Sequence, residues 1–303
     1  MNEGHFLRIA AAVAVGTFAR LVVLRSDYRQ YPSYPHAYVV HLGLGFIAAS
    51  LGALAVPAVV TRDFMAASIL ALAGQQFREV RDMERRSLEK LEETELVPRG
   101  TAYIEGIARV FEARNYLAMA AALATSLVSY ALPLPRSMAV AAGAACGLFV
   151  AAIIVGVFGR RVVGDIAVVR QGRIQFDGPL LSVEGIVLAN IGLAEARRVI
   201  EAQGVGVVVE PRDDNARATL ANVGQRQAIV HDAASIMGAR VDVSERDFTP
   251  LMRLDISTGR AGMVMVPVEP DVGALLEVVR RVPIIETSVR KPLATRAGRI
   301  AAD

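Results

Sequence analysis

The sequence predicts a polytopic α-helical membrane domain of about five spans, followed by a soluble α+β domain on the cytoplasmic side. Hydrophobic residues make up 53% of the 303 residues, which is high for a soluble protein. All seven tyrosines lie between Tyr28 and Tyr130, and the long apolar runs end at about Phe158. The rest of the chain has the mixed composition of an ordinary soluble domain. We therefore expect the membrane domain at residues 1–159 and the soluble domain at residues 160–303.

The first predicted span is residues 6–24, about as many as the roughly 20 residues needed to cross a bilayer core. Arg8 and Arg20 lie near its two ends, where their long side chains can extend towards the headgroups. The segment has neither the basic start nor the small-residue cleavage site of a signal peptide. We expect it to be a retained membrane helix.

The next apolar stretch, residues 37–77, is too long for one span and is interrupted by a proline and by a polar turn with Arg62 and Asp63. It predicts a span at residues 37–56 and a shorter helix from about residue 60. The strictly apolar part of the shorter helix covers only about 15 Å, so a re-entrant or interfacial segment is the alternative. Arg62 and Asp63 are close enough in sequence to pair.

Residues 78–95 carry a charge at almost every second position, with apolar residues at near-helical spacing between the charges. This pattern predicts that the same helix continues into water, giving a juxtamembrane charged helix over residues 63–96. Its apolar side can dock a partner or the chain's own soluble domain. A solvated charged face with no partner is the alternative.

Two more spans are predicted at residues 117–132 and 138–158. In the second, small residues recur every four positions, a spacing that lets helices approach closely within the chain or in a homo-oligomer. Arg160 and Arg161 follow directly and, by the positive-inside rule, place the soluble domain in the cytoplasm. Five spans also put the arginines after the first span inside, whereas four spans would leave them outside. The small residues are Ala139, Gly143, Gly147 and Ala151.

Residues 101–116, TAYIEGIARVFEARNY, run without a break from a charged helical sequence into the fourth predicted span. Thr101 is placed to cap this helix. Glu105, Arg109 and Glu112 recur on one of its faces. Charge at a membrane boundary is energetically costly, so this face indicates a functional requirement. A helix end with ordinary capping and side chains that extend to the interface is the alternative.

The letters YIEGIA occupy residues 103–108. Together with residues 75–85 (QQFREVRDMER), 111–116 (FEARNY) and 222–233 (NVGQRQAIVHDA), they make the chain resemble the YIEGIA family of multi-pass membrane proteins of endospore-forming bacteria. The resemblance implies an integral membrane protein that acts in sporulation or spore envelope formation with a small soluble capping partner. It implies no settled chemistry.

Polar residues within these stretches are the predicted binding residues. His231 is the only histidine among residues 160–303 and lies one turn from Gln227 on a predicted helix, so it can act in acid–base chemistry or bind an anion with Arg226. A surface or capping histidine is the alternative. The binding set is Tyr103, Glu105, Arg109, Glu112, Arg114, Asn115, Arg78, Arg81, Arg85, Gln225, Arg226 and Gln227, and the catalytic candidates are Glu105, Asp63, His231 and Asp232.

The soluble domain mixes strand-like and helix-like segments, which predicts a compact sheet with helices on one face. Asp213 or Asp214 can cap a long helix that Gly238 ends. The residues from 291 onward are expected to be loose. The expected strands are residues 166–176, 183–189, 205–209, 252–256, 263–268 and 284–289, with another around Val241, and the expected helices are residues 193–202, 216–237 and 271–281.

The sequence contains none of the common catalytic or cofactor motifs: no phosphate-loop lysine motif, dinucleotide fingerprint, HExxH or GxSxG. Its one cysteine, Cys146, lies in an apolar run, so neither a disulfide nor a cysteine zinc site can form within one chain. The net charge is only +3 and the basic residues are not clustered, which argues against a nucleic-acid partner. We predict no cofactor and no metal.

Two functions remain open from the sequence. The first is a non-catalytic membrane platform in the lipid bilayer that binds the small capping partner. The second is a membrane-embedded hydrolase, specifically a protease, in which acidic residues near the bilayer supply acid or base and the partner inhibits. Transport is disfavoured, because buried polar groups are few and no paired broken helices are evident.

Overall fold

The computed structural model describes residues 3–27, 35–77, 79–92, 95, 97–157, 161–238 and 248–302. By its contacts the chain divides into two compact units. The helical unit consists of Met1–Arg86 with Ile107–Gly159, and the mixed unit consists of Ser87–Gly106 with Arg160–Asp303. The mixed unit thus takes in a segment, Ser87–Gly106, from inside the predicted membrane domain.

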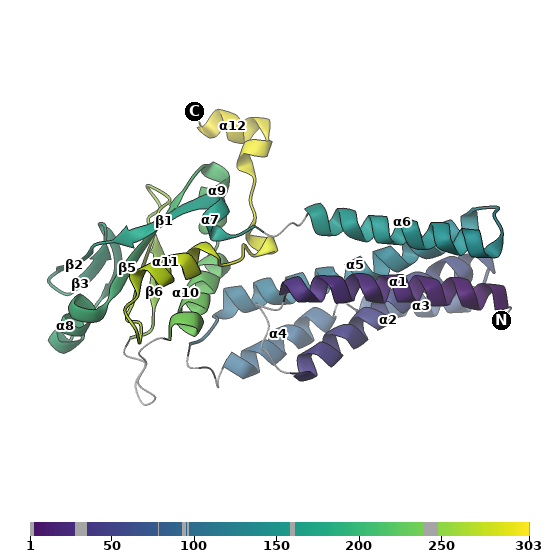
Figure 1. Ribbon diagram of the computed structural model, residues 1–303, viewed down its shortest axis with the longest axis horizontal. Coiled ribbons are helices and arrows are strands. Elements are labelled where there is room, and N and C mark those ends of the chain that lie inside the picture. The colour runs from purple at the N-terminus through teal and green to yellow at the C-terminus, as the bar shows by residue number, and fades with distance from the viewer. Residues whose placement is uncertain are drawn as a thin grey trace. The chain divides into compact units, whose positions relative to one another are not determined.

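The helical unit is built mainly from long apolar helices (Figure 1). Within the described residues, three helices are long and apolar enough to cross a membrane: Gly4–Leu24 in α1, Tyr38–Val60 in α2 and Arg136–Gly156 in α6. The short helix α3 and the long helix α5 are not among them, so this unit fits a membrane part with three of the five expected spans. The bounds are α1 Glu3–Asp27, α2 Pro35–Val60, α3 Phe64–Gln76, α4 Glu79–Glu92, α5 Thr101–Ala131 and α6 Arg136–Val157.

Small residues let the helices of this unit pack closely against α5. A Cβ atom added at Gly147 would lie 2.0 Å from Thr125 Oγ1, and one added at Gly143 would lie 2.5 Å from the Thr125 carbonyl oxygen. Ala139 and Ala151 of the same stripe are buried. The small-residue stripe on α6 therefore packs against α5 within the chain, which is one of its two predicted uses.

Gly52 in α2 faces the backbone of α5, and we expect Gly52→Ala to destabilise the helical unit. A Cβ atom there would lie 2.2 Å from the Met119 carbonyl oxygen, and overpacking of this kind costs about 1–3 kcal/mol. Gly43 in the same helix is the matched control, since no atom lies within 4 Å of its added Cβ. Gly43→Ala should be neutral or stabilise by up to about 1 kcal/mol. Unfolding of the purified full chain in detergent measures both, and equal effects would contradict this packing.

The predicted juxtamembrane helix over residues 63–96 is two helices, α3 and α4. Asp63 caps α3, because its side chain accepts a hydrogen bond from the backbone N–H of Ala66 at 2.9 Å. Arg62 precedes it with a φ of 55°, a left-handed conformation that turns the chain after α2. Asp63 therefore has a structural role at the start of a helix.

Two antiparallel sheets form the centre of the mixed unit (Figure 1). The strand orders are β1-β5-β7-β6 in one sheet and β2-β3-β4 in the other. One hydrophobic cluster includes Leu181 and Leu188 of the smaller sheet with Val208 and Val264 of the larger, so the two sheets pack face to face. The bounds are α7 Val163–Ile166, β1 Ala167–Gly172, β2 Ile174–Asp177, β3 Leu180–Val183, β4 Ile186–Asn190, α8 Ala194–Gln203, β5 Val205–Pro211, α9 Asp214–Leu220, α10 Val223–Met237, β6 Leu251–Leu254, β7 Ala261–Met265, α11 Val272–Arg280, η1 Glu286–Ser288, η2 Pro292–Ala294 and α12 Arg296–Ala302.

The central strands β5 and β7 are buried on both faces. Val208 belongs to the cluster between the sheets, and because side chains alternate along a strand, Val207 and Val209 face the opposite side. Helices α9, α10 and α11 contact the larger sheet and cover that side. The predicted arrangement is therefore right for the helices, but a second sheet covers the other face.

Two predicted elements of this unit are each divided in the structure. Residues 166–176 form two strands that belong to different sheets, since β1 pairs with β5 and β2 pairs with β3. The predicted helix at residues 216–237 is broken into α9 and α10. The break occurs because the side chain of Asn222 accepts a hydrogen bond from the backbone N–H of Gln225 at 3.1 Å and starts a new helix.

The end of the mixed unit also differs from the prediction. Residues 284–289 are not a strand and contain the 3-10 helix η1, while the residues from 291 onward include η2 and α12. The caps are as predicted: Asp213 caps α9, and Gly238 ends α10 with a φ of 67°. The strand expected around Val241 lies outside the described residues.

Candidate functional site

A buried polar cluster lies in the helical unit, where α1, α2 and α4 supply one ionisable side chain each. Arg20 of α1 is fully buried. Its Nη2 lies 3.1 Å from Nδ1 of His41 on α2, and Nε2 of His41 lies 3.8 Å from Oε1 of Glu84 on α4. The imidazole thus stands between a guanidinium and a carboxyl group.

An aromatic ring and a glycine complete the surroundings of Arg20. The guanidinium carbon lies 5.6 Å from the ring centroid of Phe111 on α5, within the range of a cation–π contact. The His41 ring contacts the same phenyl ring edge-on, with the two ring centroids 4.6 Å apart. A Cβ atom added at Gly45 would lie 2.5 Å from Arg20 Cγ, so α2 has a glycine where the arginine side chain passes. The prediction that Arg20 extends towards the headgroups is wrong, because its side chain points into the bundle.

Glu84 has the electrostatic properties of an acid–base group. Burial raises its pKa from 4.5 to about 7, and the positive charge of Arg20 offsets part of this rise. The carboxyl group is therefore close to half protonated at neutral pH. A group with such a pKa can both give and take a proton.

Further predicted residues lie on the same helices as this cluster. Nη1 of Arg81 lies 4.0 Å from Oε2 of Glu112, and Arg85 pairs with Asp82 on α4 at 3.7 Å. Arg114 and Asn115 of α5 are buried and Arg109 is exposed, while Arg78 lies outside the described residues. The sequence prediction thus includes helix neighbours of the cluster but not its members. The available signal was an arginine and a histidine inside predicted spans, where ionisable residues are rare.

The predicted residues of the mixed unit fix the Ser87–Gly106 segment to α10. The backbone N–H of Tyr103 donates to Gln227 Oε1 at 2.9 Å, and Nδ1 of His231 lies 3.1 Å from the Val97 carbonyl oxygen. Gly100 has a φ of 87°, and a Cβ atom there would lie 2.3 Å from Gln227 Nε2. Burial and, to a lesser degree, the charge of Arg99 lower the pKa of His231, so its imidazole is neutral at neutral pH.

Gln225 and Arg226 have similar structural contacts. Gln225 Oε1 accepts hydrogen bonds from the Ile285 N–H at 2.7 Å and the Ser288 hydroxyl at 3.0 Å. Nη1 of Arg226 donates to the carbonyl oxygens of Leu220 and Ala221 at the end of α9. These contacts occupy polar groups that were predicted to bind a ligand.

The four catalytic candidates do not form one site within a unit. Asp63 belongs to the helical unit, whereas Glu105, His231 and Asp232 belong to the mixed unit. Within the described residues, no group of three or more His, Cys, Asp or Glu side chains is arranged to hold a metal ion. The Arg20, His41 and Glu84 cluster is therefore the candidate site that the structure itself assembles.

These features define a class of protein in which a part with helices able to cross a membrane is joined to a soluble α+β domain. The chain belongs to the YIEGIA protein family, which matches residues 8–295. It is 39% identical over 284 residues to the uncharacterized protein YphB of Bacillus subtilis (strain 168), and the alignment covers 94% of each chain. No solved structure gives a significant match.

Proposed function

We propose that this protein is a multi-pass membrane protein of endospore-forming bacteria that acts in sporulation or spore envelope formation as a platform for a small soluble capping partner. In this proposal the chain has five spans, formed by the three apolar helices together with α3 and α5. The soluble domain is cytoplasmic, because Arg160 and Arg161 follow α6.

The observation that carries the platform proposal is the two-sided character of α4. Its apolar side is covered, since Val80 is 6% and Leu88 is 2% exposed. Its other side is exposed and polar apart from Met83, with Arg86 and Lys90 among its side chains. The segment that follows α4 is fixed to α10 by Tyr103 and His231. A helix covered on one side and followed by an anchored segment offers a partner a charged surface at low conformational cost.

Charge reversal on α4 tests the platform. We expect Arg86→Glu to reduce copurification of a small soluble protein with the full chain from sporulating cells by about tenfold, as loss of roughly 1.4 kcal/mol would. The matched control is Arg198→Glu, an exposed arginine on α8 of the mixed unit. A partner that stays bound to the Arg86→Glu chain, or no copurifying small protein at all, would contradict the proposal.

A hydrolase is the second candidate function, and the Glu84 geometry favours it. A carboxyl group with a pKa of about 7, 3.8 Å from an imidazole, has the protonation behaviour of a general acid or base. In this candidate function Glu84, and not Glu105 or Asp63, supplies the proton transfer. Loss of a general acid–base group typically costs about 10²–10⁴ in rate.

Fragments of copurifying proteins distinguish the hydrolase from the platform. If the chain is a protease, Glu84→Gln should replace the fragments seen with the native chain by full-length proteins. Glu79→Gln is the matched control, because Glu79 is exposed on the same helix. Fragments that persist with Glu84→Gln would exclude Glu84 from the mechanism.

A further inference from the structure

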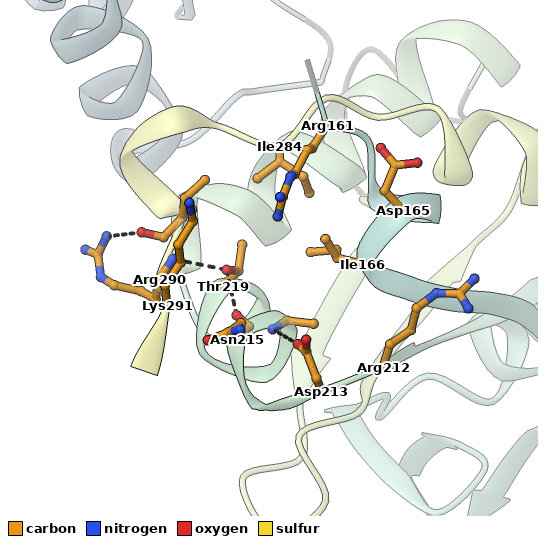
Figure 2. Close-up of a pocket in the computed structure, with 12 residues that line it drawn as sticks. Arg161, Asp165, Ile166, Arg212, Asp213, Asn215, Thr219, Ile284, Arg290 and Lys291 are labelled. Carbon is orange, nitrogen blue, oxygen red and sulfur yellow. Dashed lines mark hydrogen bonds between the residues drawn. The ribbon is translucent and has the colours of Figure 1, made fainter. Parts of the chain in front are cut away.

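A pocket of about 330 Å³ lies in the mixed unit, and none of the predicted binding or catalytic residues lines it (Figure 2). Three stretches of chain form its walls: the start of the unit around Arg161 and Asp165, the β5–α9 junction around Arg212, and the segment that contains Arg290 and Lys291. The volume is near the lower end of the roughly 300–1,000 Å³ typical of small-molecule sites. The pocket therefore suits a small ligand or a single headgroup.

The side chains that line the pocket carry an excess of positive charge. The four cations are Arg161, Arg212, Arg290 and Lys291, against the two carboxylates Asp165 and Asp213. Each carboxylate already accepts a backbone hydrogen bond, Asp165 from the Val162 N–H at 2.8 Å and Asp213 from the Ala216 N–H at 2.7 Å. The remaining charge of about +2 favours an anion with more than one negative charge.

The cations are held in different ways. The guanidinium of Arg290 donates to the carbonyl oxygens of Thr287 and Val289 at 2.9 and 3.0 Å, which fixes its place in the wall. Figure 2 shows the side chain of Arg161 extending towards the centre of the pocket, near Ile284 and Thr219. Within the described residues, neither Arg161 nor Lys291 has a side-chain hydrogen bond or ion pair. Their charges are therefore available to a ligand.

The walls are joined by specific contacts. The Arg290 N–H donates to the Thr219 hydroxyl at 3.2 Å, and the Leu293 N–H donates to Asn215 Oδ1 at 3.0 Å. These bonds hold the C-terminal segment against α9. The pocket is thus part of the folded unit.

We propose that this pocket binds a phosphomonoester-type anion, with Arg161 and Lys291 as its main charge partners. Arginine forms paired hydrogen bonds with phosphate oxygens, and lysine adds a point charge. Arg161 follows Val157, the last residue of α6, by four positions in the sequence. A phosphate on a lipid headgroup and a free phosphate both have the required chemistry. This site does not depend on the platform function.

Two probes distinguish the sources of the phosphate. The purified full chain in detergent is titrated calorimetrically with inorganic phosphate. The same preparation is mixed with dioleoyl phosphatidic acid or with dioleoyl phosphatidylcholine, and retained lipid is measured by native mass spectrometry. Retention of phosphatidic acid over phosphatidylcholine indicates a lipid headgroup, whereas saturable binding of phosphate alone indicates a soluble ligand.

Variants that remove a positive charge from the pocket test whether the measured phosphate or lipid binding takes place there. We expect Arg161→Gln and Lys291→Gln each to weaken binding about tenfold for whichever probe binds the native chain, inorganic phosphate or phosphatidic acid. Arg198→Gln is the control, because Arg198 is exposed in the same unit and does not line the pocket. Binding of neither probe, or an equal loss in the Arg198→Gln chain, would overturn the proposal. Since none of these variants changes α4, their result is separate from the test of the platform.

Discussion

Arg20→Ala is expected to lower the free energy of unfolding of the protein by about 3–5 kcal/mol, because the change truncates a large buried side chain and removes a buried hydrogen bond to a charged group. Arg20 is fully buried and its guanidinium lies 3.1 Å from His41. The truncation removes this partner of the imidazole, the contact with Phe111 and the alkyl chain that packs beside Gly45. Unfolding of the full chain in detergent measures the loss.

Two further variants separate the causes of that loss. Arg86→Ala removes an exposed arginine from α4 and should change the free energy of unfolding by less than about 0.5 kcal/mol. Arg20→Met restores most of the alkyl packing without the charge. Recovery with methionine would assign the loss to packing, whereas continued instability would assign it to the polar partners. If Arg20→Ala changed the free energy of unfolding as little as Arg86→Ala, the cluster would not contribute to the stability of the fold.

The stability of the native chain is expected to fall as the pH rises from about 4.5 to above 7, because of Glu84. Burial raises the pKa of this carboxyl group from 4.5 to about 7 in the folded chain. Between these values the folded state binds more protons than the unfolded state, so the free energy of unfolding decreases with pH. A pKa difference of this size corresponds to about 3 kcal/mol. The contribution is fully present below pH 4.5 and is lost as Glu84 ionises.

Glu84→Gln should remove this dependence, because the amide does not ionise. We expect the variant to be more stable than the native chain at pH 8 and to differ least near pH 5. Unfolding in detergent across this range measures the effect, with Glu79→Gln as the exposed control on α4. Parallel pH profiles for the native chain and Glu84→Gln would show that the carboxyl group is not desolvated in the folded state.

The features that the sequence predicted correctly depend on residues close together along the chain. The apolar runs gave helices able to cross a membrane at Gly4–Leu24, Tyr38–Val60 and Arg136–Gly156, because apolarity over some 20 residues is a local property. The caps at Asp213 and Gly238 were also predictable, since each acts on its own turn of chain. The hexapeptide at residues 103–108 indicated the family for the same reason, because its six residues are contiguous.

The candidate site itself depended on contacts between distant residues. Arg20 and His41 are 21 positions apart, and the sequence does not say that one helix turns its arginine inward towards the histidine of another. The role of Gln227 likewise required its contact with Tyr103, 124 positions away. Apolar periodicity identifies the helices. Which polar side chains come into contact is decided by how the helices pack. A buried charge is costly unless it is paired or hydrogen-bonded, and its partners come from other helices.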